Sequence, residues 1–154
     1  MSDKRYVMRY YVIAGEPSGD LHGGKLMQQI AANDPEAEFR CTGGDTMAQI
    51  AGPGRLKYHY KEMSFFGFVQ VALNLRTIFS QIDEVKSDIA SFNPDVVILI
   101  DYPAFNLRIA KWAKSRGVKV YYYIAPKVWA WKERRVKKLR RYVDRLYTIF
   151  PFET

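Results

Sequence analysis

Apolar and amphipathic segments alternate along this chain of 154 residues. Apolar runs of strand length occupy residues 7–14, 37–41, 56–60, 95–100, 119–124 and 145–150. Segments with the apolar spacing of amphipathic helices occupy residues 20–32, 68–92, 106–116 and 132–143. Continuously apolar strands separated by helices are typical of a parallel sheet buried on both faces. The pattern therefore predicts an α/β fold with a doubly wound, Rossmann-like parallel sheet.

Three segments carry more detailed predictions. The first helix is expected to turn four residues toward the core: Leu21, Leu26, Met27 and Ile30. The glycine-rich stretch after residue 41 predicts a loop that leads to the next strand. In the long helical segment, one stripe of apolar residues predicts a core-facing side: Phe68, Val71, Leu75, Ile78, Ile82, Val85 and Ile89.

The helical segment around residues 65–79 also has a second apolar face. Phe66, Val69 and Leu73 are spaced by three and four residues and fall opposite the core stripe. A helix that is apolar all round needs a second apolar partner. The pattern leaves three partners open, which are lipid, another subunit, or a further domain of the same polypeptide.

The composition narrows the class of protein. The length suits one domain with a sizeable core. The single cysteine, Cys41, excludes an internal disulfide and makes a reducing cytosol the default compartment. The sequence shows neither a signal peptide nor an apolar run that could span a membrane. No Cys/His cluster has zinc spacing, and we expect neither a metal nor another cofactor.

The positive charge is concentrated near the end of the chain. The formal net charge is +8, and residues 127–145 hold nine Lys or Arg residues against two acids, Glu133 and Asp144. A basic segment of this kind favours an anionic partner such as phosphate, nucleic acid or a bilayer surface. A solvated helix face without a partner is the alternative.

Two acids lie in the turn between the first strand and the first helix, where residues 15–20 read GEPSGD. Glycine-rich turns at this place usually cradle phosphate, but Glu16 and Asp20 would repel an anion. Carboxylates and the Ser18 hydroxyl suit the hydroxyl groups of a sugar better, because they accept hydrogen bonds from them. Ser18 and Asp20 also belong to the residue types that cap helices, so capping remains an alternative for both.

Asp101 follows the apolar run VVILI and precedes Tyr102 and Pro103. Ligands of open α/β sheets bind outside the carboxyl ends of the strands, which is where this aspartate is expected. An ionised aspartate can take a proton from an incoming hydroxyl, and general-base help is worth roughly 10²–10⁴-fold in rate. Asp101 is therefore the main catalytic candidate, with an Asx turn that performs no chemistry as the alternative.

Three segments together resemble the lipid-A-disaccharide synthase family: AGEPSGD from residue 14, DVVILIDYPAFN from residue 95 and APKVWAWKERRVKKL from residue 125. The resemblance covers residues 8–154. It implies that residues 1–154 are the N-terminal, acceptor-side domain of a B-type glycosyltransferase fold, with the UDP-binding C-terminal domain absent from this chain. The implied reaction is an inverting, metal-independent transfer from UDP-2,3-diacylglucosamine to 2,3-diacylglucosamine 1-phosphate, which forms a β-1,6 bond and releases UDP.

The resemblance also implies roles for individual residues. Asp101 matches the family's base, and the matching substrate-binding residues are Glu16, Ser18, Gly19, Asp20 and Asn106. The residues that match the surface for acyl chains and the anionic inner membrane are Phe65, Phe66, Val69 and Leu73, together with Arg134 and Arg135. A peripheral position on the cytoplasmic face of the membrane follows, in a Gram-negative bacterium. A C-terminal half or a second subunit would complete the enzyme, and nucleic acid is not expected as a partner.

The sequence departs from the family pattern at Ala125 and Lys127, which stand where small polar residues are common and receive no role. Two other functions remain open. A non-catalytic module could grip nucleic acid or an anionic membrane with the basic helix, while Trp129, Trp131 and Tyr142 stack on bases. A flavodoxin-like nucleotide binder is the second alternative, and the acids of the first turn count against it.

Overall fold

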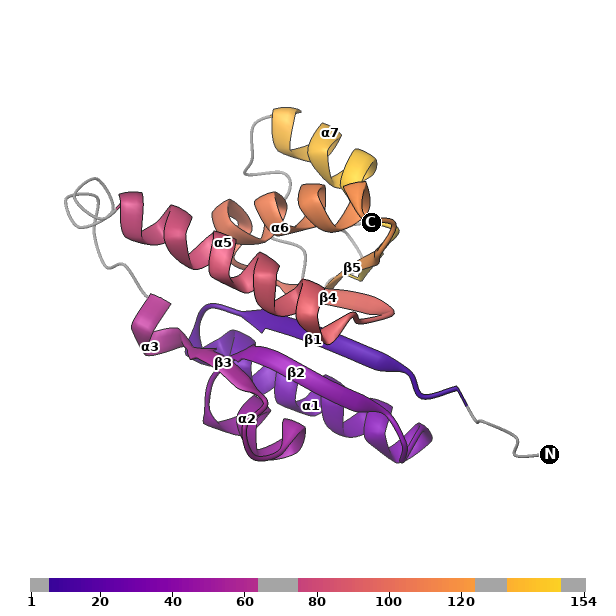
Figure 1. Cartoon of the computed structure of the whole chain (residues 1–154). Coiled ribbons are helices and arrows are strands. Elements are labelled where there is room, and N and C mark those ends of the chain that lie inside the picture. The colour runs from indigo at the N-terminus through magenta and orange to yellow at the C-terminus, as the bar shows by residue number, and fades with distance from the viewer. Residues whose placement is uncertain (1–5, 64–74, 124–132, 148–154) are drawn as a thin grey trace.

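A computed structural model of the chain describes residues 6–63, 75–123 and 133–147. Its centre is a parallel sheet of six strands in the order β3-β2-β1-β4-β5-β6 (Figure 1). The strands are β1 (Arg9–Ala14), β2 (Glu38–Gly43), β3 (Leu56–His59), β4 (Val96–Ile100), β5 (Lys119–Tyr123) and β6 (Arg145–Tyr147). Every residue of β4 is buried, as a continuously apolar central strand requires.

Helices cover both faces of this sheet. They are α1 (Pro17–Asn33), α2 (Asp45–Ala51), α3 (Tyr60–Met63), α5 (Leu75–Phe92), α6 (Pro103–Ser115) and α7 (Glu133–Tyr142). Figure 1 shows α1 and α2 on one face and α5, α6 and α7 on the other. Alternate residues of β1 enter two separate cores, because successive side chains of a strand point to opposite faces. Tyr11 and Ile13 pack on the α5–α6 side, whereas Val12 and Ala14 pack on the α1–α2 side.

This architecture confirms the doubly wound parallel fold that the alternating pattern predicts. The element bounds differ from the predicted ones by a few residues. For example, α6 begins at Pro103 rather than at residue 106. Proline suits the first turn of a helix, because the N–H group that it lacks would have no partner there.

The packing face of α1 agrees with the predicted one at three of its four positions. Met27 is fully buried, and Leu26 and Ile30 are partly buried against the core. Leu21 is 49% exposed, so its expected core position is wrong. The helix also presents Gly19 and Gly23 to the sheet. A Cβ atom at Gly23 would lie 2.7 Å from the Met47 sulfur and 2.8 Å from Ile100 Cδ1. Small residues let α1 lie close to the strands, and a search for apolar spacing does not detect them.

The core stripe of α5 is confirmed in its second half. Ile82, Val85 and Ile89 are buried and pack in the core of that face. Leu75 is 48% exposed, so its predicted core position is wrong. Leu75 is the first residue of the helix as described, whereas the later turns of α5 pack against the sheet. Phe68 and Val71 of the stripe lie outside the described residues, as does the second apolar face with Phe65, Phe66, Val69 and Leu73.

Candidate functional site

The candidate site lies at the carboxyl ends of β1 and β4, the two central strands, which pair in parallel from Tyr10 and Val96 to Ala14 and Ile100. The chain leaves β1 toward α1 on one face of the sheet and leaves β4 toward α6 on the other (Figure 1). Open α/β sheets bind ligands in the crevice where such connections diverge. The turns after Ala14 and after Ile100 are therefore the expected walls of a ligand site.

These two turns touch through Gly15 and Tyr102. A Cβ atom at Gly15 would lie 2.5 Å from the Tyr102 ring, so the ring can pack here only against glycine. The Tyr102 hydroxyl donates a hydrogen bond to the Met63 carbonyl oxygen at 3.2 Å. Burial and, to a lesser degree, the negative charge of Glu16 raise the pKa of Tyr102. Tyr102 thus connects the turn after β1 with the turn after β4.

The turn after β4 has an unusual backbone. Asp101 and Tyr102 both have left-handed conformations, with φ angles of 45° and 48°. Residues held in such regions cost about 1–3 kcal/mol each and cluster at functional sites. The Asp101 carbonyl oxygen accepts hydrogen bonds from the Asn106 side-chain amide at 2.7 Å and from the Tyr122 hydroxyl at 2.5 Å. These contacts hold the turn in its strained form and fix the point from which the Asp101 side chain projects.

The carboxyl group of Asp101 is half-buried at this edge of the sheet. Burial raises its pKa above the ordinary value of 3.8, and a hydrogen bond with the backbone of Tyr102 offsets part of that rise. A carboxylate with a raised pKa holds a proton more strongly, which is what a general base needs. The role of Asp101 as a general base stays a prediction.

Asn106 lies beneath the turn. It is fully buried, and its amide nitrogen also donates to the Ile100 carbonyl oxygen at 3.3 Å. Its side-chain oxygen has no hydrogen-bond partner within the part of the chain that the structure describes. The predicted substrate contact of Asn106 remains a prediction, and what the structure adds is a positioning contact to Asp101.

Asp20 caps a helix other than its own. The side chain is 5% exposed, and its two oxygens accept hydrogen bonds from the backbone N–H groups of Gly44 at 2.8 Å, Thr46 at 3.1 Å and Met47 at 3.0 Å. These N–H groups belong to the start of α2, where intrahelical partners are missing. The predicted loop after β2 therefore contains a helix, whose N-terminus is satisfied by a residue far away in the sequence.

The other residues of the acidic turn divide into exposed and buried ones. Glu16 is the N-cap residue of α1 without a side-chain capping bond, and it is exposed, as is Ser18. Gly19 is buried, and a Cβ atom there would lie 3.1 Å from the Cβ atom of Ala14. Glu16 and Ser18 can therefore meet a ligand directly, whereas Gly19 packs within the turn and Asp20 caps α2.

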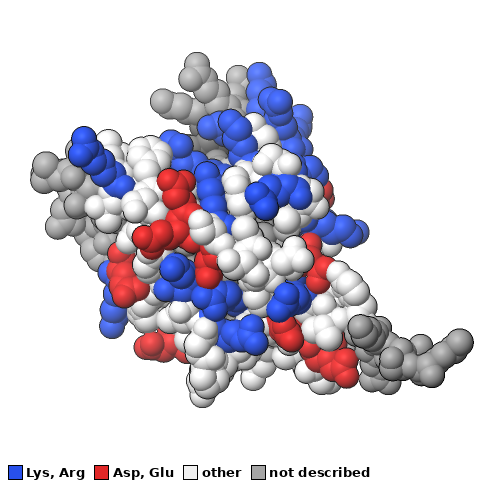
Figure 2. Space-filling model, viewed as in Figure 1, with Lys and Arg blue, Asp and Glu red and all other residues white. Residues whose placement is uncertain are grey.

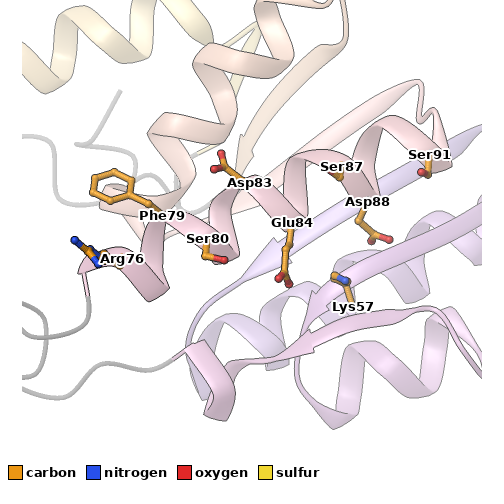
Figure 3. Close-up of a pocket in the computed structure, with 9 residues that line it drawn as sticks. All are labelled: Lys57, Arg76, Phe79, Ser80, Asp83, Glu84, Ser87, Asp88 and Ser91. Atoms are coloured by element: carbon orange, nitrogen blue, oxygen red, sulfur yellow. The ribbon is translucent and has the colours of Figure 1, made fainter.

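A separate hollow, of about 690 Å³, lies along α5 (Figure 3). Its lining is mainly the polar side of that helix, with Lys57 from β3 opposite. One of its carboxylates, Asp88, already pairs with Arg40 at 2.6 Å and accepts a hydrogen bond from the Tyr11 hydroxyl at 2.6 Å. The hollow lies along a helix face, away from the turns after β1 and β4, and it joins none of the predicted site residues.

Lys and Arg side chains gather over α6 and α7 at the top of Figure 2, whereas Asp and Glu side chains lie mainly over α5 and below it. The exposed cations of α7 include Lys137, Lys138, Arg140 and Arg141. Arg134 and Arg135 belong to the same helix, and their side chains lie outside the described part. The predicted basic helix is therefore confirmed, and its partner stays a prediction.

Within the described residues, 6–63, 75–123 and 133–147, no group of three or more His, Cys, Asp or Glu residues is placed to hold a metal ion. No helix in these ranges is long and apolar enough to cross a bilayer.

A family model described as lipid-A-disaccharide synthetase matches residues 10–154. The chain belongs to this family. Membership in the lipid-A-disaccharide synthetase family confirms the resemblance carried by the segments around Glu16, Asp101 and Trp129.

Curated relatives agree with this assignment. The lipid-A-disaccharide synthase of Geobacter metallireducens is 45% identical over 145 residues, which are 94% of this chain and 37% of the relative. That of Coxiella burnetii is 37% identical over 153 residues, which are 99% of this chain and 39% of the relative. This member of the family thus spans less than two-fifths of the length of the relatives that it matches.

Solved structures resemble the chain in fold. A UDP-N-acetylglucosamine 2-epimerase matches with a TM-score of 0.61 at 12% identity, over 96% of this chain and 43% of the other. The UDP-GlcNAc 2-epimerase of Neisseria meningitidis, solved with UDP-GlcNAc, matches with a TM-score of 0.60 at 11% identity, over 92% and 40%. The likeness concerns the fold alone, and it is consistent with the N-terminal half of a two-domain B-type fold.

Sequence reasoning missed two residues of the candidate site. Tyr102 and Gly15 form the contact between the two turns, but they carry no pattern of spacing or charge. The signal that was available is the order of the residues, since Gly15 follows β1 directly and the bulky Tyr102 follows β4 after one residue. That order becomes informative only when the two strands are known to be neighbours.

Proposed function

We propose that this chain is the acceptor-side domain, residues 1–154, of a glycosyltransferase of lipid A biosynthesis. The donor would be UDP-2,3-diacylglucosamine and the acceptor 2,3-diacylglucosamine 1-phosphate. The products would be a β-1,6-linked disaccharide and UDP. Family membership supports the class of reaction. A C-terminal domain, corresponding to the remaining length of the relatives, would bind UDP, and the reaction would need no cofactor.

The observation that carries the proposal is the position of Asp101. It lies where the β1 and β4 connections diverge, on a strained turn that Asn106 and Tyr122 hold in place. A reacting group held in one geometry saves the entropy of positioning it during the reaction. The pKa of the group, raised by burial, suits it to accept a proton.

In the proposed step, the Asp101 carboxylate accepts the proton of the acceptor's 6-hydroxyl group. The oxygen of that group attacks the anomeric carbon of the donor from the face opposite UDP. The bond between this carbon and the phosphate oxygen breaks, and UDP leaves with the bonding electrons. Attack from the opposite face inverts the configuration of the anomeric carbon.

The remaining site residues receive two kinds of role. Glu16 and Ser18, which are exposed in the turn after β1, would accept hydrogen bonds from sugar hydroxyls. Gly19 would let the turn after β1 lie close to Ala14, Asn106 would hold the turn after β4, and Asp20 would hold the start of α2.

A peripheral position on the cytoplasmic face of the inner membrane completes the proposal. The residues assigned to acyl chains and lipid are Phe65, Phe66, Val69 and Leu73, with Arg134 and Arg135 facing the anionic surface. The support is the second apolar face in the sequence and the positive charge of α7.

The test joins this chain to the part of the Geobacter metallireducens relative that it does not cover. We expect the fusion protein to release UDP and form the disaccharide, and this 154-residue chain alone to form none. Asp101→Asn in the fusion protein should lower the rate by roughly 10²-fold or more, the range for lost general-base help. Asparagine keeps the shape of the side chain and tolerates the left-handed backbone.

Ser115→Ala, at the far end of α6, serves as the matched control and should leave the rate unchanged. Steady product formation by this chain alone would refute the proposal that a second domain is needed to bind UDP. A near-normal rate in the Asp101→Asn fusion protein would reduce Asp101 to a turn-forming residue.

A further inference from the structure

A groove lies between α6 and α7, directly beside the candidate site. Its volume is about 340 Å³, and seven residues line it: Pro103, Ala104, Leu107, Arg108, Lys111, Lys138 and Tyr142. Pro103 and Ala104 follow the strained turn of Asp101 and Tyr102 without a gap in the chain. One end of the groove therefore borders the residue proposed as the base.

The helices present the lining residues on facing sides. Ala104, Leu107, Arg108 and Lys111 are spaced by three and four residues, which places them on one side of α6. Lys138 and Tyr142 are one turn apart on α7. At a rise of 1.5 Å per residue, Arg108 and Lys111 lie about 6 and 10 Å along the helix from Ala104. Arg108 and Lys111 are thus one turn apart on α6, and Lys138 lines the same groove from α7.

The positive charges of this groove have no negative partner among the residues that the structure describes. Within the described residues, no carboxylate lies within 4.0 Å of Arg108, Lys111 or Lys138. The Arg108 guanidinium lies over the Phe79 ring, 4.9 Å from its centre. The next basic residue on α6, Lys114, differs because it pairs with Asp144.

Three cations around one groove repel each other, and a bound anion removes that repulsion. Ala104 and Leu107 form an apolar wall between the cations and the turn. A ligand that combines an anion with a compact, less polar body fits this distribution.

We propose that the α6–α7 groove binds the phosphate monoester of a sugar 1-phosphate whose reacting hydroxyl lies at Asp101. The inference rests on the proposed function and assigns the acceptor's phosphate a site. A pyranose 1-phosphate carries its 6-hydroxyl and its phosphate at different ends of the ring. With the hydroxyl at the turn, the ring can lie over Ala104 and Leu107 and the phosphate between Arg108, Lys111 and Lys138.

The same anionic chemistry could come from a phospholipid headgroup, so the test has two arms. In the first arm, the isotope-labelled 154-residue chain is titrated with glucosamine 1-phosphate, and the backbone amide signals of α6 and α7 are followed by NMR. Glucosamine, which lacks the phosphate group, is titrated as the control. In the second arm, the same chain is mixed with phosphatidylglycerol vesicles and sedimented.

Two double variants separate the groove from the overall charge. Lys111→Glu with Lys138→Glu reverses two exposed groove residues, and Lys25→Glu with Lys137→Glu makes the same change of net charge at exposed positions outside the lining. We expect the groove variant to weaken glucosamine 1-phosphate binding about tenfold or more, the scale of one lost charge-assisted hydrogen bond. The control variant should stay within about twofold of the original chain. Melting curves confirm that both variants fold.

Three outcomes would overturn the proposal. The original chain could fail to bind glucosamine 1-phosphate, or the two double variants could lose binding equally, or the groove residues could matter only for vesicles. Because binding needs no sugar transfer, an inactive fusion protein together with groove-dependent binding would refute the proposed function and leave the groove site standing. In an active fusion protein, the groove variant should raise KM for the acceptor and leave kcat nearly unchanged.

Discussion

At the scale of single residues, the ionised carboxyl group of Asp101 works against folding. Burial raises its pKa in the folded protein above the ordinary value of 3.8. The folded state therefore binds the proton more tightly than the unfolded state does. The stabilisation that this protonation contributes is complete below the ordinary pKa and is lost as the pH rises through the folded pKa.

Asp101→Asn should consequently stabilise this chain at neutral pH. We expect a gain on the order of 0.5 kcal/mol, kept small because water screens a half-exposed group, and we expect the gain to shrink as the pH falls below the ordinary aspartate range. Urea unfolding at neutral and acidic pH measures it. A variant that is less stable than the original chain at neutral pH would show that the carboxylate holds the turn together.

The Glu16 side chain should influence the pKa of Tyr102 and the sugar substrate while leaving the fold intact. It is exposed and makes no capping bond, so Glu16→Gln should change the free energy of unfolding by less than about 0.5 kcal/mol. Burial is the larger cause of the raised pKa of Tyr102, and the Glu16 charge is the smaller one. The variant should therefore lower the pKa of Tyr102 in an ultraviolet titration and slow sugar transfer in the fusion protein. A marked loss of thermal stability would contradict this assignment.

At the scale of elements, α2 depends on Asp20 of α1. Asp20→Ala would leave three N–H groups at the start of α2 without their acceptor, two of them in buried hydrogen bonds. We expect a loss of about 2–3 kcal/mol in the free energy of unfolding, from the lost cap and the unpaired donors. Ser18→Ala, at an exposed position of the same turn, should change it by less than about 0.5 kcal/mol. Equal stability of the two variants would show that α2 forms without this cap.

The same contact shows where sequence-based prediction stops. The strands were predictable because a run such as VVILI in β4 has one stable environment, the centre of a sheet. Asp101 was predictable because its place follows from the end of that strand. The helix α2 was not predictable, because the side chain that caps it, Asp20, lies 24 residues before Gly44 in the sequence. The close approach of α1 to the sheet was not predictable either. It depends on Gly19 and Gly23, which carry no apolar signal.

At the scale of the whole molecule, membrane binding should have separable apolar and electrostatic parts. Phe66 and Leu73 belong to the apolar face opposite the core stripe, and full burial is worth about 1.5–3 kcal/mol per large side chain. Each Lys or Arg near an anionic surface adds about 1 kcal/mol, and salt screens only this part. Phe66→Ser with Leu73→Ser should therefore abolish vesicle binding at high salt without unfolding the domain.

Charge reversal of Arg134 and Arg135 is the complementary change, and it should weaken vesicle binding chiefly at low salt. Sedimentation with anionic vesicles at two salt concentrations measures both effects. If the double serine variant unfolds, or binds vesicles as before, the second apolar face belongs to the core or to a protein interface.

The central place of β1 in the sheet has a consequence for the synthesis of this protein. One neighbour of β1 in the sheet, β2, follows it closely in the sequence. The other neighbour is β4, so Tyr10 cannot pair with Val96 until that later strand has been synthesised. Chains leave the ribosome from the N-terminus and fold progressively, and distant strand pairing is slow. Until Ile100 has emerged, one edge of the apolar stretch at residues 10–14 stays open to other nascent chains. We therefore expect the first half of this polypeptide to remain prone to aggregation until β4 has been synthesised.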